Sequence, residues 1–245
     1  MIWRPNLTKR IVILTGAGIS AESGIATFRD KDGLWENHPV ERVATPEAFL
    51  RDPALVHKFY NERRRQLLSA EVQENPAHTA LAKLENELPG QVTIVTQNID
   101  DLHERGGSTN VIHMHGELLK MFCTSSHERF EIRQDIQVDH ECGCCGLKGT
   151  LRPDIVWFGE VPYQMEEIIS LCERADLFIS IGTSGHVYPA AGLCDIASSA
   201  QKLEINADAT QISAKFDKNI VGLAGVEVPK LVDNILAGNR RQNGN

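Results

Sequence analysis

The chain has 245 residues, of which 42% are hydrophobic, and this is enough to bury a sizeable core in one large domain. Its formal net charge of −8, from 33 acidic and 25 basic residues, excludes an overall basic field for nucleic acid or for an anionic membrane. The residues after Met1 form neither a secretory hydrophobic region nor a span of about 20 apolar residues. We therefore expect a soluble, cytoplasmic protein that binds neither nucleic acid nor membrane.

Short, mostly apolar segments alternate along the chain with helical candidates. The expected strands are 10–15, 91–96, 177–181 and 201–205, and the expected helices are 53–69, 77–87, 165–174, 190–199 and 229–236. Strands that are apolar on both faces are typical of a buried parallel sheet. The alternation predicts an α/β fold, a parallel sheet with helices on both faces. Segments 27–69 and 118–150 lack this rhythm and indicate a smaller inserted module.

Each expected strand is followed by a polar loop. The loops are 16–20, 97–100, 182–185 and 206–208, and they combine small residues with amide and hydroxyl side chains. Ligands of an open α/β sheet bind in the crevice at the carboxyl ends of its strands. Four such loops suit a large polar ligand that carries phosphates and riboses.

The first loop begins with Gly16-Ala17-Gly18, whose backbone amides can approach a pyrophosphate. Ala21 stands where the usual fingerprint has a third glycine, and no acidic residue ends a second strand about 20 residues later. A standard dehydrogenase is therefore a poor match. Taken alone, the glycine pair fits a plain strand-to-helix turn equally well.

Two further motifs carry amide, carboxylate and imidazole groups. Gln97, Asn98 and Asp100 follow a strand, where they can bind ribose hydroxyls or a carboxamide, or can cap a helix. His113 and His115 are expected on the same side of an extended segment. Imidazole is best suited to move a proton near neutral pH, although either histidine can equally be structural.

The chain between the first two expected strands, 10–15 and 91–96, offers two candidate contacts with open alternatives. Residues 27–30 and 33–35 can form a lid over a cofactor or an ordinary surface loop. Tyr60 and Arg63 share one helix face, where a guanidinium beside a phenol can hold a carboxylate. The alternative is that Arg63 belongs to a solvated basic face formed by residues 63–65.

Four of the six cysteines lie within a short loop-rich stretch. They are Cys123, Cys142, Cys144 and Cys145. In a reducing compartment this pattern favours a metal over disulfides. The Cys142-x-x-Cys145 spacing predicts half of a structural zinc site, with Cys123 as a third ligand. The fourth position is open to Cys144, His127 or His140 or stays unfilled, and a metal-free cluster is the alternative.

Eight ordered motifs resemble those of the sirtuins. They read GAGISAESGIATFR, GLW, ATPEAF, TQNIDDLH, HMHGEL, LRPDIVWFGE, GTSGHVYPA and EINAD. The resemblance covers nearly the whole chain and implies one catalytic domain over residues 1–240, followed by a frayed tail at 241–245. Within it, the resemblance implies a Rossmann-like core of about 7–27, 70–117 and 151–240 and a smaller helical and zinc-binding module of about 28–69 and 118–150.

The resemblance implies an NAD-dependent protein-lysine deacylase that removes acetyl and succinyl groups and releases nicotinamide and O-acyl-ADP-ribose. The acyl-amide oxygen attacks C1′ of the nicotinamide ribose, and His115 then deprotonates a ribose hydroxyl, with Asn98 as the second catalytic residue. The residues implied to bind NAD are Gly16, Ala17, Gly18, Ala21, Phe28, Arg29, Trp35, Gln97, Asn98, Ile99, Asp100, Gly182, Thr183, Ser184, Asn206 and Ala224.

The resemblance also implies the substrate contacts. Tyr60 and Arg63 match the pair with which the family's desuccinylases hold a distal carboxylate, and Ala44 leaves room for it. An acylated-lysine protein adds as a strand between 156–159, beginning at Val156, and 185–188. We expect a zinc ion to be bound by Cys123, Cys142 and Cys145. We also expect the protein to be a monomer. Protein ADP-ribosyl transfer, which would use the same NAD loops, is the main alternative, ahead of a non-catalytic binder and a dehydrogenase.

Overall fold

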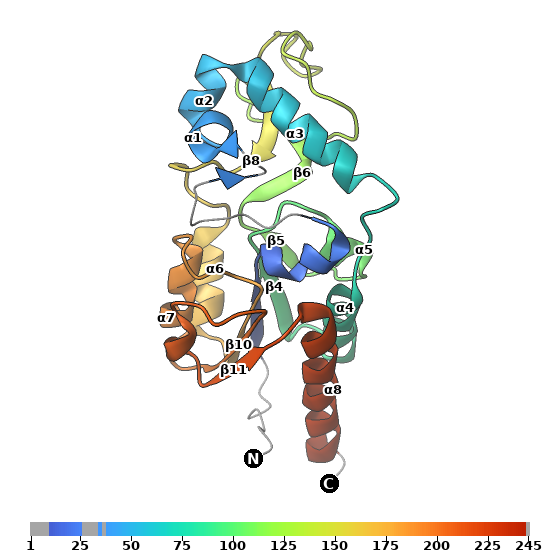
Figure 1. Ribbon diagram of the computed structural model, residues 1–245, viewed down its shortest axis with the longest axis vertical. Coiled ribbons are helices and arrows are strands. Elements are labelled where there is room, and N and C mark those ends of the chain that lie inside the picture. Colours follow the sequence, from blue (N-terminus) through green and yellow to red (C-terminus); the bar gives the residue numbers. More distant parts are fainter. Residues whose placement is uncertain (1–9, 26–33, 36–37, 244–245) are drawn as a thin grey trace.

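The computed structural model describes residues 10–25, 34–35 and 38–243, so the roles expected of Phe28 and Arg29 fall outside the described residues. Its main element is a six-stranded parallel sheet in the order β11-β10-β9-β1-β4-β5 (Figure 1). The strands are β1 (Ile11–Thr15), β4 (Val92–Thr96), β5 (Val111–His113), β9 (Leu177–Ile181), β10 (Gln201–Asn206) and β11 (Lys218–Val221).

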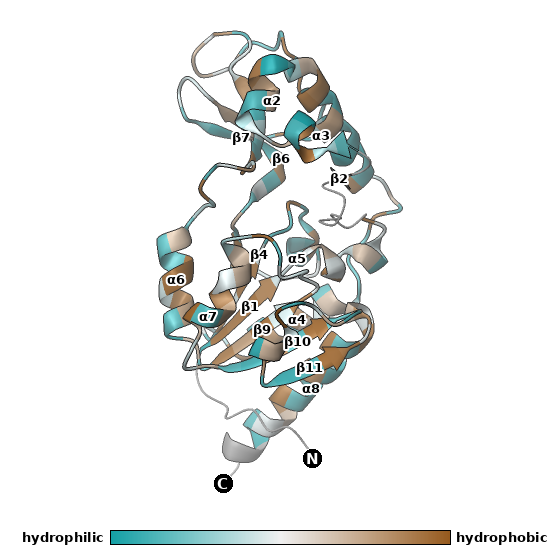
Figure 2. Cartoon of the chain, turned by 60° about the vertical axis from the view of Figure 1, so that its left-hand side comes forward, coloured by the Kyte–Doolittle hydropathy of each residue, from teal (hydrophilic) through white to brown (hydrophobic). Residues whose placement is uncertain are grey.

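Helices cover both faces of this sheet. On one face, Ile11 and Ile13 of β1 pack against α4 (Pro76–Glu87) and α8 (Ala224–Asn243). On the other face, Val12 and Leu14 pack against α6 (Met165–Glu173) and α7 (Leu193–Ile196). Figure 2 shows the central strands β1, β4 and β9 in the brown of apolar residues. The α/β class expected from the sequence is therefore confirmed.

Several boundaries differ from the expectations. β5 and β11 were not predicted, because β5 has only three residues and β11 is a half-exposed edge strand. The expected helix 190–199 is a 3-10 turn, Ala190–Gly192, followed by α7, which ends at Ile196. α8 begins at Ala224 and contains Pro229, where the sequence predicted its start. None of the described helices is long and apolar enough to cross a membrane.

A smaller module lies at the strands' carboxyl end (Figure 1). It contains α1 (Val40–Val43), α2 (Pro46–Arg51), α3 (Pro53–Leu67), the short strands β2 (Leu34–Trp35) and β3 (His38–Pro39), and the antiparallel sheet β7-β6-β8. That sheet consists of β6 (Gly116–Cys123), β7 (Arg129–Glu131) and β8 (Leu151–Ile155). The segment 118–150 therefore contains most of β6 and all of β7, although these strands lack the apolar rhythm of the parallel sheet.

The loops after β1 and β9 touch through their backbones. Gly16 N donates to Ile181 O at 3.0 Å, and Gly18 N donates to Gly182 O at 2.8 Å. A Cβ atom at Gly182 would lie 2.4 Å from Ile19 N, and the residue has a φ of +64°. Only glycine fits this position, because both the space and the left-handed backbone exclude a side chain. The two loops are therefore held together directly through their backbones.

Gly182→Ala tests this contact. We expect it to lower the free energy of unfolding by about 3–5 kcal/mol, since left-handed strain and overpacking add. Gly90→Ala is the matched control, because Gly90 has a φ of +72° but nothing within 4 Å of an added Cβ. Its cost should be about 1–2 kcal/mol in the same urea titration. Equal losses at both positions would contradict the close contact.

Candidate active site

The carboxyl ends of the central strands open into a cavity of about 730 Å³ between the sheet and the smaller module. All four polar loops predicted from the sequence contribute to its lining. The expected site residues that line it are Gly16, Ala17, Gly18, Ala21, Gln97, Asn98, Ile99, Asp100, Gly182, Thr183, Ser184, Asn206, Ala224, His115, Tyr60 and Val156. Arg63 is not among the lining residues, and the side chain of Trp35 is outside those described.

A buried hydrogen-bonded chain joins the first two loops. Asn98 Nδ2 donates to Gly16 O at 3.2 Å and to Ser20 Oγ at 3.0 Å. Ser20 Oγ in turn donates to Asp100 Oδ2 at 3.0 Å. Both amide hydrogens of Asn98 are thus used inside the protein, and its acceptor oxygen is the group offered to a ligand. Ser20 was not among the predicted site residues, since a serine in a glycine loop carries no signal of its own.

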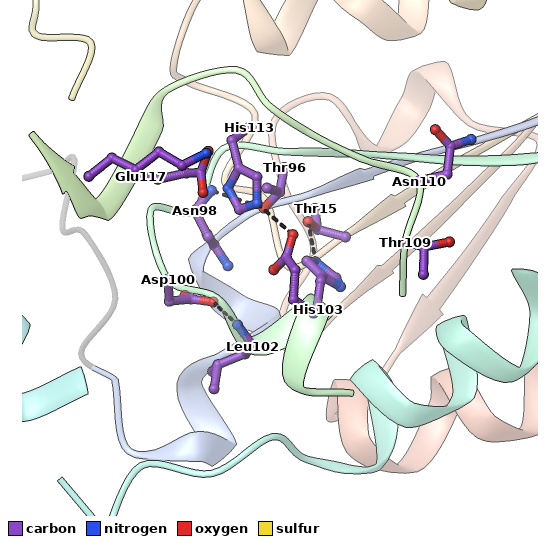
Figure 3. Close-up of polar contacts among 12 residues, drawn as sticks. Thr15, Thr96, Asn98, Asp100, Leu102, His103, Thr109, Asn110, His113 and Glu117 are labelled. Carbon is purple, nitrogen blue, oxygen red and sulfur yellow. Dashed lines mark hydrogen bonds and ion pairs between the residues drawn. The ribbon is translucent and has the colours of Figure 1, made fainter. Parts of the chain in front are cut away.

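Asp100 is almost fully buried beside this chain. Burial raises the pKa of Asp100 to about 6, although hydrogen bonds from Leu102 N and Ser20 act in the opposite direction. Figure 3 shows the carboxylate next to Leu102, with Thr15 and His103 paired nearby. A carboxyl group with a pKa close to neutrality can hold or release a proton near bound ligand.

The structure separates the two histidines of the HMH motif. β5 ends at His113 and a turn follows, so the prediction of one extended segment with both rings on the same side is wrong. His113 Nε2 contacts Glu104 Oε1 at 2.8 Å, and this carboxylate raises the pKa of His113 against the lowering effect of burial. His115 instead lines the cavity, and burial lowers the pKa of its ring.

Among the described residues, the ring of His115 has one hydrogen-bond partner, the carbonyl oxygen of Gln97, 3.0 Å from Nδ1, and this contact orients the ring. A carbonyl oxygen only accepts, so Nδ1 carries the hydrogen. In the neutral ring the lone pair is then on Nε2. His115 therefore combines the tautomer, the lowered pKa and the location of a general base.

A carboxylate that the sequence reading missed holds the loop after β10. Glu204 is buried, and Thr210 Oγ1 donates to its Oε1 at 2.7 Å while Ser213 Oγ donates to Oε2. Asn206 Nδ2 donates to Thr183 O at 2.9 Å, which joins this loop to the one after β9. The available signal was a carboxylate between Leu203 and Ile205, the two apolar residues of β10.

The smaller module supplies the opposite wall. Tyr60 is completely buried on α3, and its hydroxyl oxygen accepts a hydrogen bond from Trp157 Nε1 at 3.0 Å. The guanidinium of Arg63, one turn further on, lies 3.4 Å from the ring centre of Phe59 and donates to the Phe59 carbonyl at 2.7 Å. Ala44 also lines the cavity and leaves space beside Tyr60.

Comparisons with known proteins identify the family. Residues 16–189 match the Sir2 family. The chain belongs to this family. The NAD-dependent protein deacylase of Vibrio cholerae is 57% identical over 235 residues, which are 95% of this chain and 96% of that protein. The NAD-dependent protein deacylase SIR2rp3 of Trypanosoma brucei brucei is 56% identical over 239 residues, or 96% of this chain and 97% of that protein.

Solved structures agree with this sirtuin in fold. A Sir2 homologue in complex with NAD is 42% identical and superposes with a TM-score of 0.84, covering 93% of this chain and 89% of that one. A Sir2 protein bound to an acetylated peptide is 29% identical with a TM-score of 0.80 and covers 94% of both chains. The Rossmann-like core and the smaller module are therefore features of the family.

The cysteine cluster of the sirtuin contains four thiols. The Sγ atoms of Cys123, Cys142, Cys144 and Cys145 all lie within 4.8 Å of one another, and His127 and His140 are not part of this group. A tetrahedral ion with Zn–S bonds of about 2.3 Å places its sulfurs about 3.8 Å apart. The Sγ atoms of Cys123 and Cys145 are 3.7 Å apart, while those of Cys142 and Cys144 are 3.0 Å apart and would have to separate by less than 1 Å. The cluster is consistent with a structural zinc ion, and Cys144 is the candidate for the position that the sequence left open.

Cys144→Ser tests the fourth ligand. We expect the purified sirtuin to hold one zinc ion per chain and the variant to bind zinc about a hundredfold more weakly, because a thiolate is lost from a closed site. Competition with a chromophoric chelator measures this affinity. His127→Ala and His140→Ala are the controls and should bind zinc as the wild type does. Loss of zinc in either histidine variant, with Cys144→Ser unaffected, would reverse the assignment.

Proposed function

We propose that this sirtuin is an NAD-dependent protein-lysine deacylase that removes acetyl and succinyl groups, releasing nicotinamide and O-acyl-ADP-ribose. The observation that carries the proposal is the position of His115. Its ring lies in the cavity that joins the polar strand-end loops to Tyr60 of the smaller module. The relatives named NAD-dependent protein deacylase, which match almost the full chain, support the same activity.

NAD occupies the strand-end side of the cavity in this proposal. The amides of residues 16–18 bind the pyrophosphate, while Thr183, Ser184 and Asn206 hold the adenosine end. Gln97, Asn98 and Asp100 surround the nicotinamide ribose, where the acceptor oxygen of Asn98 meets its polar groups. Asn98 thus acts by orienting NAD. The Sir2 homologue solved as a complex with NAD supports this location.

The reaction consumes NAD as a co-substrate. The amide oxygen of the acyl-lysine forms a bond to C1′ of the nicotinamide ribose as the bond to nicotinamide breaks. His115 then accepts a proton from a ribose hydroxyl at Nε2, and that oxygen attacks the former amide carbon. Addition of water completes the exchange and yields free lysine and O-acyl-ADP-ribose. The hydrogen bond from Nδ1 to Gln97 O stabilises the charged ring after it has taken the proton.

The peptide lies between residues 156–159 and residues 185–188, both of which contribute to the cavity lining. Backbone hydrogen bonds to a strand added there make sequence preference shallow, because they do not depend on side chains. Tyr60 and Arg63 receive the distal carboxylate of a succinyl group. Arg63 reaches it by rotating its side chain away from the carbonyl of Phe59.

A mass-spectrometric assay with acetyl-lysine and succinyl-lysine peptides tests these roles. We expect O-acyl-ADP-ribose from both peptides, and a loss of about a hundredfold or more in His115→Ala, which lacks the base. Arg63→Met should lower the ratio of succinyl to acetyl turnover by about tenfold or more, because it removes a charged hydrogen bond.

Arg65→Met is the control for the guanidinium, since Arg65 lies on the same helix with its side chain largely exposed. It should keep the wild-type ratio. Nicotinamide release that is equally fast without any peptide would refute the deacylase assignment. Transfer of ADP-ribose to a protein side chain would instead support the ADP-ribosyltransferase alternative.

The pH profile tests the base directly. His115 works as a base only when neutral, and burial lowers its pKa from the ordinary 6.5. The acid limb of kcat/KM for the acetyl peptide should therefore have its midpoint below pH 6.5. The neighbouring carboxyl group of Asp100 has a pKa of about 6, which falls in the same range. The Asp100→Asn variant removes this group, so its titration can be distinguished from that of His115. An acid limb that disappears in Asp100→Asn would show that Asp100, not His115, is the titrating group.

A further inference from the structure

Trp157 and Tyr60 meet inside the wall of the cavity, and both side chains are buried. The indole Nε1 of Trp157 donates to the hydroxyl oxygen of Tyr60 at 3.0 Å. An indole N–H can only donate, so it occupies an acceptor position of the phenol. The hydroxyl hydrogen of Tyr60 is therefore directed to some partner other than the indole. Trp157 in this way influences the direction in which the Tyr60 hydroxyl donates its own hydrogen bond.

Trp157 is itself held in two ways. The guanidinium of Arg152 lies 3.4 Å from the centre of its ring, and the Trp157 backbone N donates to Glu160 Oε2 at 2.8 Å. Arg152 and Glu160 are joined by two hydrogen bonds, of 2.8 and 2.9 Å. Arg152 also donates to Ile155 O at 2.7 Å. The ring and the backbone of Trp157 are thus fixed by one ion pair.

The phenol remains a donor at neutral pH. Burial raises the pKa of Tyr60 well above its ordinary value, so the hydroxyl keeps its hydrogen. An ionised carboxylate has no hydrogen and only accepts. A phenol that accepts a hydrogen bond from an indole can still donate its own hydrogen to a carboxylate. An aliphatic acyl chain has no acceptor for this hydrogen.

We propose that Trp157 is a positioning residue for acidic acyl groups, which acts by orienting the Tyr60 hydroxyl to donate to the carboxylate of the bound acyl chain. This rests on the proposed deacylase function and on the place of Tyr60 in its acyl pocket. Trp157→Phe removes the donor and keeps an aromatic ring under Arg152. The indole then no longer donates to the Tyr60 hydroxyl oxygen, and the orienting effect of this hydrogen bond is lost.

The experiment compares wild type, Trp157→Phe, Tyr60→Phe and the double variant on succinyl-lysine and butyryl-lysine peptides. Both acyl chains have four carbons, and only the succinyl chain carries a carboxylate. The readout is the ratio of the two kcat/KM values, because changes common to both substrates cancel. Tyr60→Phe should lower the ratio about tenfold or more, and Trp157→Phe about three- to tenfold.

The double variant decides whether Trp157 acts through Tyr60. If it does, the ratio in the double variant equals that in Tyr60→Phe alone, since there is no hydroxyl left to orient. Effects that multiply in the double variant, or an unchanged ratio in Trp157→Phe, would overturn the inference about Trp157. Neither result would contradict the role of Tyr60 in the acyl pocket. An unchanged ratio in Tyr60→Phe would contradict the assignment of Tyr60 to the pocket for the succinyl carboxylate. The inference about Trp157 would then fail as well. Butyryl turnover by the wild type, with release of O-acyl-ADP-ribose, reports on the deacylase function independently of Tyr60.

Discussion

The active site depends on the backbone contact between the loops that leave β1 and β9. Gly18 N and Gly182 O are only 2.8 Å apart, so neither loop has room for a side chain between them. This contact fixes the carbonyl of Gly16, which receives one hydrogen of Asn98. The orientation of Asn98 then follows, and with it the positions of Ser20 and Asp100. A close approach of two glycine loops thus determines the polar geometry several bonds away.

Buried polar groups are the second constraint on this region. Asp100 and Glu204 lie almost fully inside the protein, where an ionised carboxylate is costly unless it accepts several hydrogen bonds. Glu204 receives hydroxyl donors from the loop that it positions, so its burial is compensated. Asp100 is less well compensated, and its raised pKa is the consequence. The two carboxylates thus serve different purposes: Glu204 gives the loop a fixed shape, whereas Asp100 can take up or release a proton near the proposed ribose site.

The sequence predicted the sheet core because apolar periodicity is a local property. The strands and helices around β1, β4, β9 and β10 were found in this way, and so was the convergence of their polar loops. β5 and β11 were missed because they are short or polar, and the pairing of β6 with β8 joins segments far apart in the chain. The fourth cysteine was left open because ligand spacing does not show how a loop folds back. The partner of Tyr60 was missed for the same reason, since 97 residues separate it from Trp157.

Backbone hydrogen bonds from residues 156 and 158 connect the catalytic core with the smaller module. Val156 N donates to His115 O at 2.9 Å, and Phe158 N donates to Ala44 O at 3.0 Å. The segment proposed to pair with the peptide is therefore attached at Val156 to the residue proposed as the base and at Phe158 to Ala44 of the smaller module. A shift of this segment relative to the sheet would break the hydrogen bond at His115. Because the main chain makes this link, the distance from the substrate amide to the base does not depend on the peptide's side chains. That arrangement is what a deacylase with broad sequence tolerance requires.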